Sequence, residues 1–170
     1  MRTLRVALII AAALVLQTTL ARFLVRGSLG VDLVLVAVVY ISLTSGPTVG
    51  VLSGTAAGLA QDALASGIVG IGGLAKTIVG FLTGTIGTAF IVTQSVPRFL
   101  VFFVATVIEM AIIAGFRALV DPGPVGVGIG AIVAQAFGNA LVGIVAFQVT
   151  EGVPRAIERR RSMGWGRRKD

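Results

Sequence analysis

The sequence predicts an all-α integral membrane protein, built as a bundle of six transmembrane helices. Only 12% of the 170 residues are charged, which is about half the share in soluble domains, and the mean hydropathy is +1.01. Long apolar stretches also recur along the chain, separated by short breaks rich in glycine, proline and polar residues. This composition leaves too little polar surface for a globule in water, and the length indicates one domain.

The apolar stretches give one membrane domain, residues 1–151, followed by a basic cytoplasmic tail, residues 152–170. The predicted spans, in chain order, are residues 4–24, 31–45, 47–64, 71–91, 98–120 and 127–150.

The first span follows two arginines, as a signal peptide would, but its apolar character continues past any cleavage point, so we expect a retained helix. Gln17 lies inside it, and an amide in hydrocarbon is expected to turn toward other helices. The second span is shorter than the ~20 residues that cross a bilayer. The turn at Gly46-Pro47 separates it from the third span. A five-span count, which fuses these two spans, is the alternative, and the turn argues against it.

Glycines recur every fourth residue in the third span, and a second such row follows in the fourth. The rows are Gly46, Gly50, Gly54 and Gly58, and then Gly80 and Gly84. Residues four apart lie above one another on a helix, so these rows lack side chains and let a second backbone approach closely. We expect the chain to pack around the third helix and the rows to offer a groove to a partner's transmembrane helix. Tight packing with no further role is the alternative.

Three ionisable residues lie in or beside the spans: Asp62, Lys76 and Glu109. Burying such groups in a membrane is costly, so each is a candidate for function. A short loop joins the helices of Asp62 and Lys76, and we expect an ion pair that either fixes this loop or binds a ligand or proton. Glu109 and Asn139 lie near the midpoints of consecutive spans. We expect a hydrogen bond between them, serving as contact between helices or as part of a proton relay.

The cationic residues predict the orientation in the membrane. With six spans, both ends of the chain lie on one side and Lys76 is intramembrane. That side receives ten cations and the other receives three; the ten are Arg2, Arg5, Arg98 and seven in the tail, and the three are Arg22, Arg26 and Arg117. We therefore expect cytoplasmic N and C termini.

The tail is a polybasic segment beside the membrane. Its cations and its tryptophan are Arg155, Arg159, Arg160, Arg161, Trp165, Arg167, Arg168 and Lys169. Anionic lipid attracts such a segment by ~1 kcal/mol per charge near the surface. A plain topology signal and a docking site for a cytoplasmic partner are the alternatives.

Composition also limits the chemistry. The chain has no cysteine and no histidine, which removes disulfides, the usual metal ligands and the commonest general base. We find no nucleophile–base pair, phosphate loop or metal cluster in the sequence, so we expect neither an enzyme nor a cofactor. Most of the net charge of +7 lies in the tail, so nucleic acid is not an expected partner, and the lipid bilayer is.

Three stretches of the first half resemble the bacterial rod shape-determining protein family MreD. Leu16-Gln17-Thr18-Thr19-Leu20 resembles its first-helix motif, and residues 31–36 resemble its entry to the second helix, with valine where proline is usual. Residues 54–82 resemble its block of glycine helix, aspartate, Gly-x-x-Gly and following helix. The second half is similar only in span count and length.

The resemblance implies an inner-membrane protein of the cell-elongation machinery. Its relatives associate with the bitopic protein MreC, and with it contact MreB filaments, the glycosyltransferase RodA and a class B transpeptidase. The family's fold is similar to the substrate-binding subunits of energy-coupling-factor transporters, and its members are not known to catalyse a reaction.

Two functions follow. The first is a scaffold that supports cell shape and peptidoglycan synthesis by binding an MreC-type partner. The alternative is a solute-binding subunit of a small-molecule, vitamin-type transporter, with Asp62 and Lys76 lining an outward pocket. The chain has one tryptophan and one tyrosine, and this scarcity of aromatic residues favours the scaffold.

Overall fold

The computed structural model describes residues 2–23, 30–65, 69–90, 94–120 and 128–166; at residues 2, 20–23 and 151–166 it describes the backbone alone. The described residues form six α-helices. They are α1 (Arg2–Phe23), α2 (Leu33–Ser45), α3 (Pro47–Leu64), α4 (Ile71–Ala89), α5 (Ser95–Val120) and α6 (Ile129–Gly166). The expected all-helical class is therefore confirmed.

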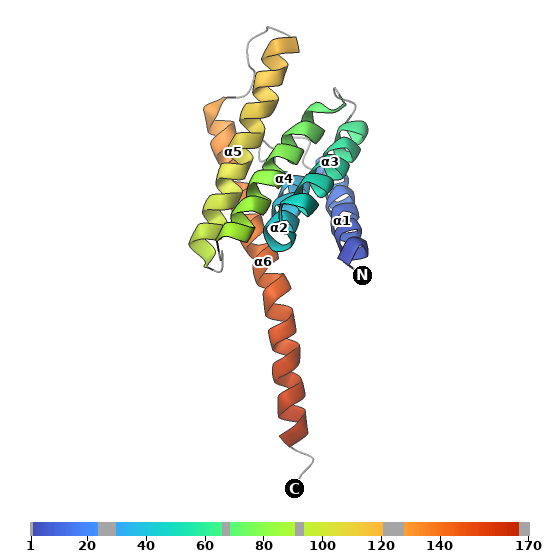
Figure 1. Ribbon diagram of the computed structural model, residues 1–170, viewed down its shortest axis with the longest axis vertical. Coiled ribbons are helices and arrows are strands. Elements are labelled where there is room, and N and C mark those ends of the chain that lie inside the picture. Colours follow the sequence, from blue (N-terminus) through green and yellow to red (C-terminus); the bar gives the residue numbers. More distant parts are fainter. Residues whose placement is uncertain (1, 24–29, 66–68, 91–93, 121–127, 167–170) are drawn as a thin grey trace.

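Successive helices run in opposite directions, so α1 begins and α6 ends on the same side of the bundle (Figure 1). On that side α6 continues as a single helix well beyond the other five. The last predicted span ends at residue 150, whereas the helix extends to Gly166. In this continuation Ala156 and Arg159–Arg161 favour helix, whereas Gly152 and Pro154 disfavour it.

Two of the helices in the described part are long and apolar enough to cross a membrane: residues Ser95–Val120 and Ile129–Thr150. By contrast, α2 has 13 residues, and at 1.5 Å per residue it is about 20 Å long. A hydrocarbon core is about 30 Å thick, so α2 alone is too short to cross it. The count of six spans stays a prediction.

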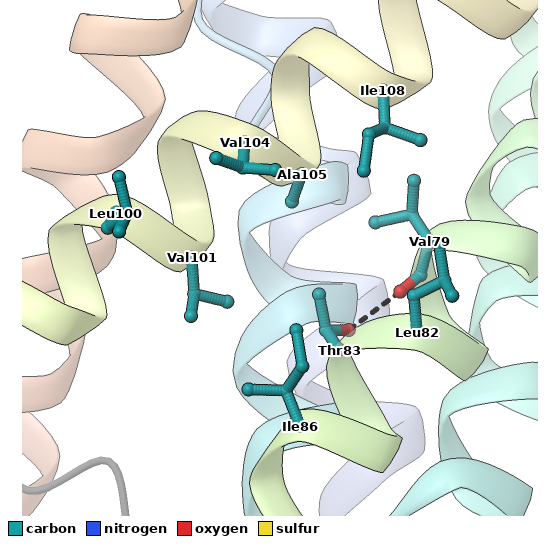
Figure 2. Close-up of a pocket in the computed structure, with 9 residues that line it drawn as sticks. All are labelled: Val79, Leu82, Thr83, Ile86, Leu100, Val101, Val104, Ala105 and Ile108. Atoms are coloured by element: carbon teal, nitrogen blue, oxygen red, sulfur yellow. Dashed lines mark hydrogen bonds between the residues drawn. The ribbon is translucent and has the colours of Figure 1, made fainter. Parts of the chain in front are cut away.

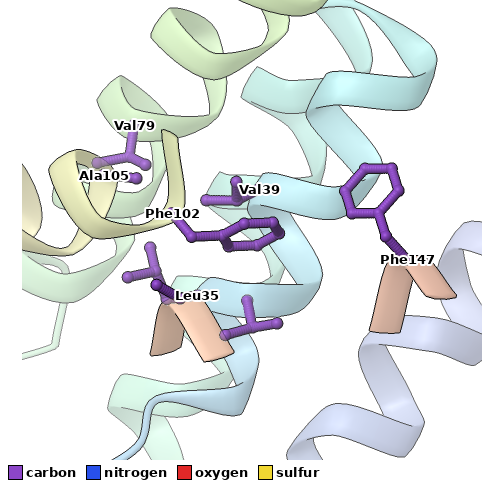
Figure 3. Packing of buried hydrophobic residues seen from close by; sticks show 8 residues of the cluster. Leu35, Val39, Val79, Phe102, Ala105 and Phe147 are labelled. Carbon is purple, nitrogen blue, oxygen red and sulfur yellow. The ribbon is translucent and has the colours of Figure 1, made fainter. Parts of the chain in front are cut away.

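The short helix α2 is the centre of the bundle, because it contacts each of the other five helices. Its run of valines and leucines is apolar on every side, which is typical of a fully enclosed helix. Leu35 and Val39 of α2 pack against side chains from three other helices, namely Val79 of α4, Phe102 and Ala105 of α5, and Phe147 of α6 (Figure 3). The expectation that the chain packs around the third helix was wrong, since continuous burial, rather than glycine content, decides which helix is central.

The glycine rows join α3 to α4. A Cβ atom added at Gly50 would collide with the carbonyl oxygen of Gly80, and one added at Gly54 would collide with the carbonyl oxygen of Lys76. At Gly58 an added Cβ would lie 2.5 Å from the Cα atom of Gly73. Bare backbone on both helices is what allows this approach in a membrane.

Gly46 and Gly84, the first and the last glycine of the two predicted rows, meet at the turn between α2 and α3. Gly46 is the only residue between the two helices, and its φ of 90° is one that glycine adopts without strain. Pro47 follows as the first residue of α3, where its missing N–H costs nothing. Gly84 of α4 lies against Pro47, so that an added Cβ would be 2.5 Å from the proline Cα.

Candidate functional site

Asp32 caps the N-terminus of α2 inside the bundle. Its Oδ1 accepts a hydrogen bond from the backbone N–H of Leu35 at 2.9 Å, the usual contact of an aspartate at this position. Only 9% of the residue is exposed. Because α2 is short, this capped end lies among the other helices, in contact with their side chains.

Two side-chain amides form hydrogen bonds with the polar backbone groups of the non-helical segment that leads into α2. Gln17 of α1 donates to the carbonyl of Val31 at 3.1 Å and accepts from the N–H of Leu33 at 2.8 Å. Asn139 of α6 accepts from the N–H of Asp32 at 2.8 Å. Irregular backbone is tolerated within a membrane protein only where such partners replace water, so both amides help to place the start of α2.

Lys76 of α4 reaches the same point and pairs with two carboxylates. Its Nζ donates to Oδ2 of Asp32 at 2.9 Å and to Oε1 of Glu109 on α5. Lys76 is 2% exposed and Glu109 is 0% exposed. A buried charge needs an opposite charge and good hydrogen bonds to be tolerated, and this contact provides both for the ammonium group.

The remaining polar neighbours come from α3 and α5. Gln61 places its amide nitrogen 3.4 Å from each oxygen of Asp32, and Asn139 donates to the hydroxyl of Thr106 at 3.1 Å. We call the six residues that meet at the start of α2 the polar hub. One comes from each helix, counting Asp32 with α2, and they are Gln17, Asp32, Gln61, Lys76, Glu109 and Asn139.

Two oxygens of the polar hub differ from the others. Among the described residues, Oε2 of Glu109 and Oε1 of Gln61 are buried and have no hydrogen-bond partner. Buried polar atoms without a partner are rare in native structures, and each calls for an explanation.

The expected ion pair between Asp62 and Lys76 was wrong. Oδ2 of Asp62 instead accepts from the backbone N–H groups of Gly70 at 2.8 Å and Gly73 at 3.0 Å, and so caps the start of α4. The positive end of a helix favours a carboxylate there. Lys76 turns into the bundle, where Asp32 is available because the start of α2 is buried among the other helices.

The expected hydrogen bond between Glu109 and Asn139 was also wrong, although the two residues lie near each other. Glu109 pairs with Lys76, and Asn139 bonds to the N–H of Asp32 and to Thr106, one turn before Glu109 on α5. The two side chains do not bond to each other because each has another partner. The ammonium group of Lys76 takes Oε1 of Glu109, and the backbone N–H of Asp32 takes Oδ1 of Asn139.

Asp32 and Gln61 are the two residues of the polar hub that the sequence did not single out as sites. Asp32 was placed at the start of the second predicted span, residues 31–45, without a role of its own. The shortness of the second span was the available signal, since a helix that cannot reach the membrane surface must begin in the interior.

The other predicted site residues lie elsewhere. The glycine rows are occupied by contacts within the chain. Residues Arg155, Arg159, Arg160, Arg161 and Trp165 belong to the extended part of α6, where only the backbone is described, and Arg167, Arg168 and Lys169 lie outside the described residues. Arg98, predicted to begin the fifth span and counted with the cations on the side of the termini, lies in α5 with its guanidinium 4.2 Å from the centre of the Phe147 ring.

A cavity of about 190 Å³ lies between α4 and α5 (Figure 2). Nine residues line it: Val79, Leu82, Thr83 and Ile86 of α4, and Leu100, Val101, Val104, Ala105 and Ile108 of α5. The Thr83 hydroxyl is already bonded to the carbonyl of Val79 at 2.8 Å. Asp62 and Lys76 do not line this cavity, so it is not the polar outward pocket that a solute-binding subunit was expected to have.

No group of three or more histidine, cysteine, aspartate or glutamate residues in the described part of the chain could hold a metal ion.

Comparison with known families identifies the chain. The family model described as rod shape-determining protein MreD matches residues 1–147. The chain belongs to the MreD family. The resemblance stated from the sequence is thereby confirmed, and it extends into the second half, where no motif had been recognised. No curated protein and no solved structure matches the chain.

Membership of the MreD family establishes the function in outline. It assigns this protein to rod shape determination, as a membrane protein of the MreBCD shape machinery and not as a known enzyme. Family membership does not favour the transporter alternative.

Proposed function

We propose that this MreD-family protein is a non-catalytic scaffold of the cell-elongation machinery in the bacterial inner membrane. It binds an MreC-type bitopic protein and thereby supports cell shape and peptidoglycan synthesis. The observation that carries the proposal is the family match over residues 1–147. Contacts with MreB, RodA and a class B transpeptidase follow through the MreC-type partner.

The use of polar groups inside the bundle supports a scaffold. Lys76, Glu109 and Asn139 contact other helices of the same chain, and the glycine rows pack α3 on α4. The surface that remains for a neighbour in the membrane is largely apolar, with exposed side chains such as Leu52 and Leu82. Such a surface suits recognition of another helix by shape.

We place the MreC-type contact at the cavity between α4 and α5. Its lining is apolar, it lies beside the spanning helix α5, and it follows α4 for two turns, from Val79 to Ile86. A bitopic partner has one transmembrane helix, and large apolar side chains at i and i+4 on such a helix match two turns of groove. Lipid acyl chains are the competing occupants.

Co-purification with an MreC-type protein tests this placement. Leu82→Trp fills the cavity mouth, and we expect it to lower recovery of the partner about tenfold, which corresponds to a loss of about 1.4 kcal/mol. Leu52→Trp is the matched control, because Leu52 is 65% exposed on α3 and does not line the cavity. It should leave recovery unchanged.

The outcomes separate the two parts of the proposal. Equal recovery with both variants would remove the cavity as the contact and leave the scaffold standing. No recovery of an MreC-type protein with the wild-type chain would remove the scaffold proposal itself.

We further propose that both termini are cytoplasmic and that the cations of the tail bind anionic lipid or a cytoplasmic partner. The excess of cations on one side supports this orientation, as does the position of the start of α1 and the end of α6 on one side of the bundle (Figure 1).

A further inference from the structure

The polar hub carries unequal numbers of ionisable groups of each sign. It contains two carboxyl groups, those of Asp32 and Glu109, and one ammonium group, that of Lys76. All three side chains are buried, with exposed fractions of 12%, 1% and 3% respectively. If each group is ionised, the hub holds one uncompensated negative charge within the membrane domain.

The hydrogen bonds show where this surplus lies. Asp32 is fully satisfied: Oδ1 accepts from the N–H of Leu35, Oδ2 accepts from Lys76, and the amide of Gln61 faces both oxygens. Glu109 uses only Oε1, toward Lys76, and its Oε2 is buried without a partner among the described residues. The uncompensated charge is therefore on Glu109.

No neighbouring element in the described part supplies a second cation to Glu109. The helix α2 contributes the anion Asp32, α4 contributes Lys76, and α6 contributes the neutral Asn139. The next ionisable group, Asp62 of α3, is another carboxylate and is engaged at the start of α4. An isolated buried carboxylate is strongly disfavoured, so something positive must meet Oε2.

We propose that the polar hub binds one exchangeable monovalent positive charge at Oε2 of Glu109, either a proton or an alkali-metal ion. A proton transferred from hydronium forms an O–H bond at Oε2; one O–H bond of the hydronium breaks and a water molecule remains. An alkali-metal ion takes oxygen ligands, and Oε1 of Gln61 is the second buried hub oxygen without a partner. In both cases the bound species neutralises the hub.

The experiment measures the melting temperature of the purified full-length protein in lipid nanodiscs. One arm varies pH with N-methylglucamine as the only cation, and the other adds NaCl or KCl at fixed pH and fixed ionic strength. Binding to the folded state stabilises it by mass action. If the species is a proton, the melting temperature falls as pH rises; if it is an alkali-metal ion, the melting temperature rises with salt and saturates.

Glu109→Gln is the decisive variant, because it keeps the shape of the side chain and removes the charge. We expect it to abolish whichever dependence the wild type shows. Glu151→Gln, the same change at the end of the apolar part of α6, should keep the wild-type dependence. Equal pH and salt responses in the wild type and Glu109→Gln would overturn the proposal.

A measurement on the wild type alone covers the case in which Glu109→Gln does not fold. A bound proton gives the infrared carbonyl band of an undissociated carboxylic acid, whereas a bound ion gives a saturable salt response without that band. A wild-type protein with neither signal would also overturn the proposal.

Discussion

At the scale of single residues, Lys76 shows how one side chain can serve several helices. Its ammonium group joins Asp32 at the start of α2 to Glu109 in the middle of α5, while its own backbone carbonyl lies against Gly54 of α3. A lysine within a predicted span was recognised from the sequence as a candidate. Its pairing with Asp32 and Glu109 was not predicted, because these residues lie 44 and 33 positions away along the chain.

Lys76→Met should therefore destabilise the protein strongly. The change leaves two buried carboxylates without their cation, and breaking a buried ion pair in this way costs about 3–5 kcal/mol. Denaturant unfolding in detergent measures the effect. Adding Glu109→Gln to Lys76→Met should recover part of the loss, since one of the two stranded charges is then removed.

Lys169→Met provides the comparison, because Lys169 belongs to the basic tail and lies outside the described residues. It should unfold like the wild type. A Lys76→Met protein as stable as this control would contradict the central place of Lys76 in the hub.

At the scale of elements, the contact between α3 and α4 depends on missing side chains. The spacing of the glycines predicts close packing at the glycine rows, and the predicted third span, residues 47–64, has the same limits as α3. It could not specify the partner helix. A helix inside the same chain and a helix of another protein make the same demand for small residues.

Gly54→Leu should prevent the correct packing of α3 on α4. An added Cβ collides with backbone, which cannot move aside as a flexible side chain can, and overpacking of this kind costs about 1–3 kcal/mol or more. Gly115→Leu is the matched control on α5, where an added Cβ meets nothing within 4 Å. Thermal stability in detergent compares the two variants.

This pair of variants also bears on partner binding. Loss of the MreC-type protein from Gly54→Leu would follow from misfolding and would not identify a partner surface. If Gly54→Leu proves as stable as Gly115→Leu, the described contact between α3 and α4 is wrong.

At the scale of the whole molecule, the alternation of helix direction and the distribution of charge give the same topology. We expect a fluorescent protein fused after Asp170 to fluoresce in the cytoplasm, and a periplasmic reporter inserted at residues 121–127 to be active. The count of ten cations against three predicts this orientation. Alkaline phosphatase activity at the C-terminal fusion would reverse it.

The sequence by itself determined the membrane class, the approximate limits of the first five helices and the family, because apolar run length, glycine spacing and turn residues are local properties of the chain. Only the tertiary structure decided that α2 is central, that its N-terminus is buried, and that Asp32, Lys76 and Glu109 meet there. Those results depend on which helices are neighbours and how deep each one begins. A buried charge needs a partner of opposite charge, and the arrangement of the helices decides which partner is within reach. The sequence does not specify that arrangement.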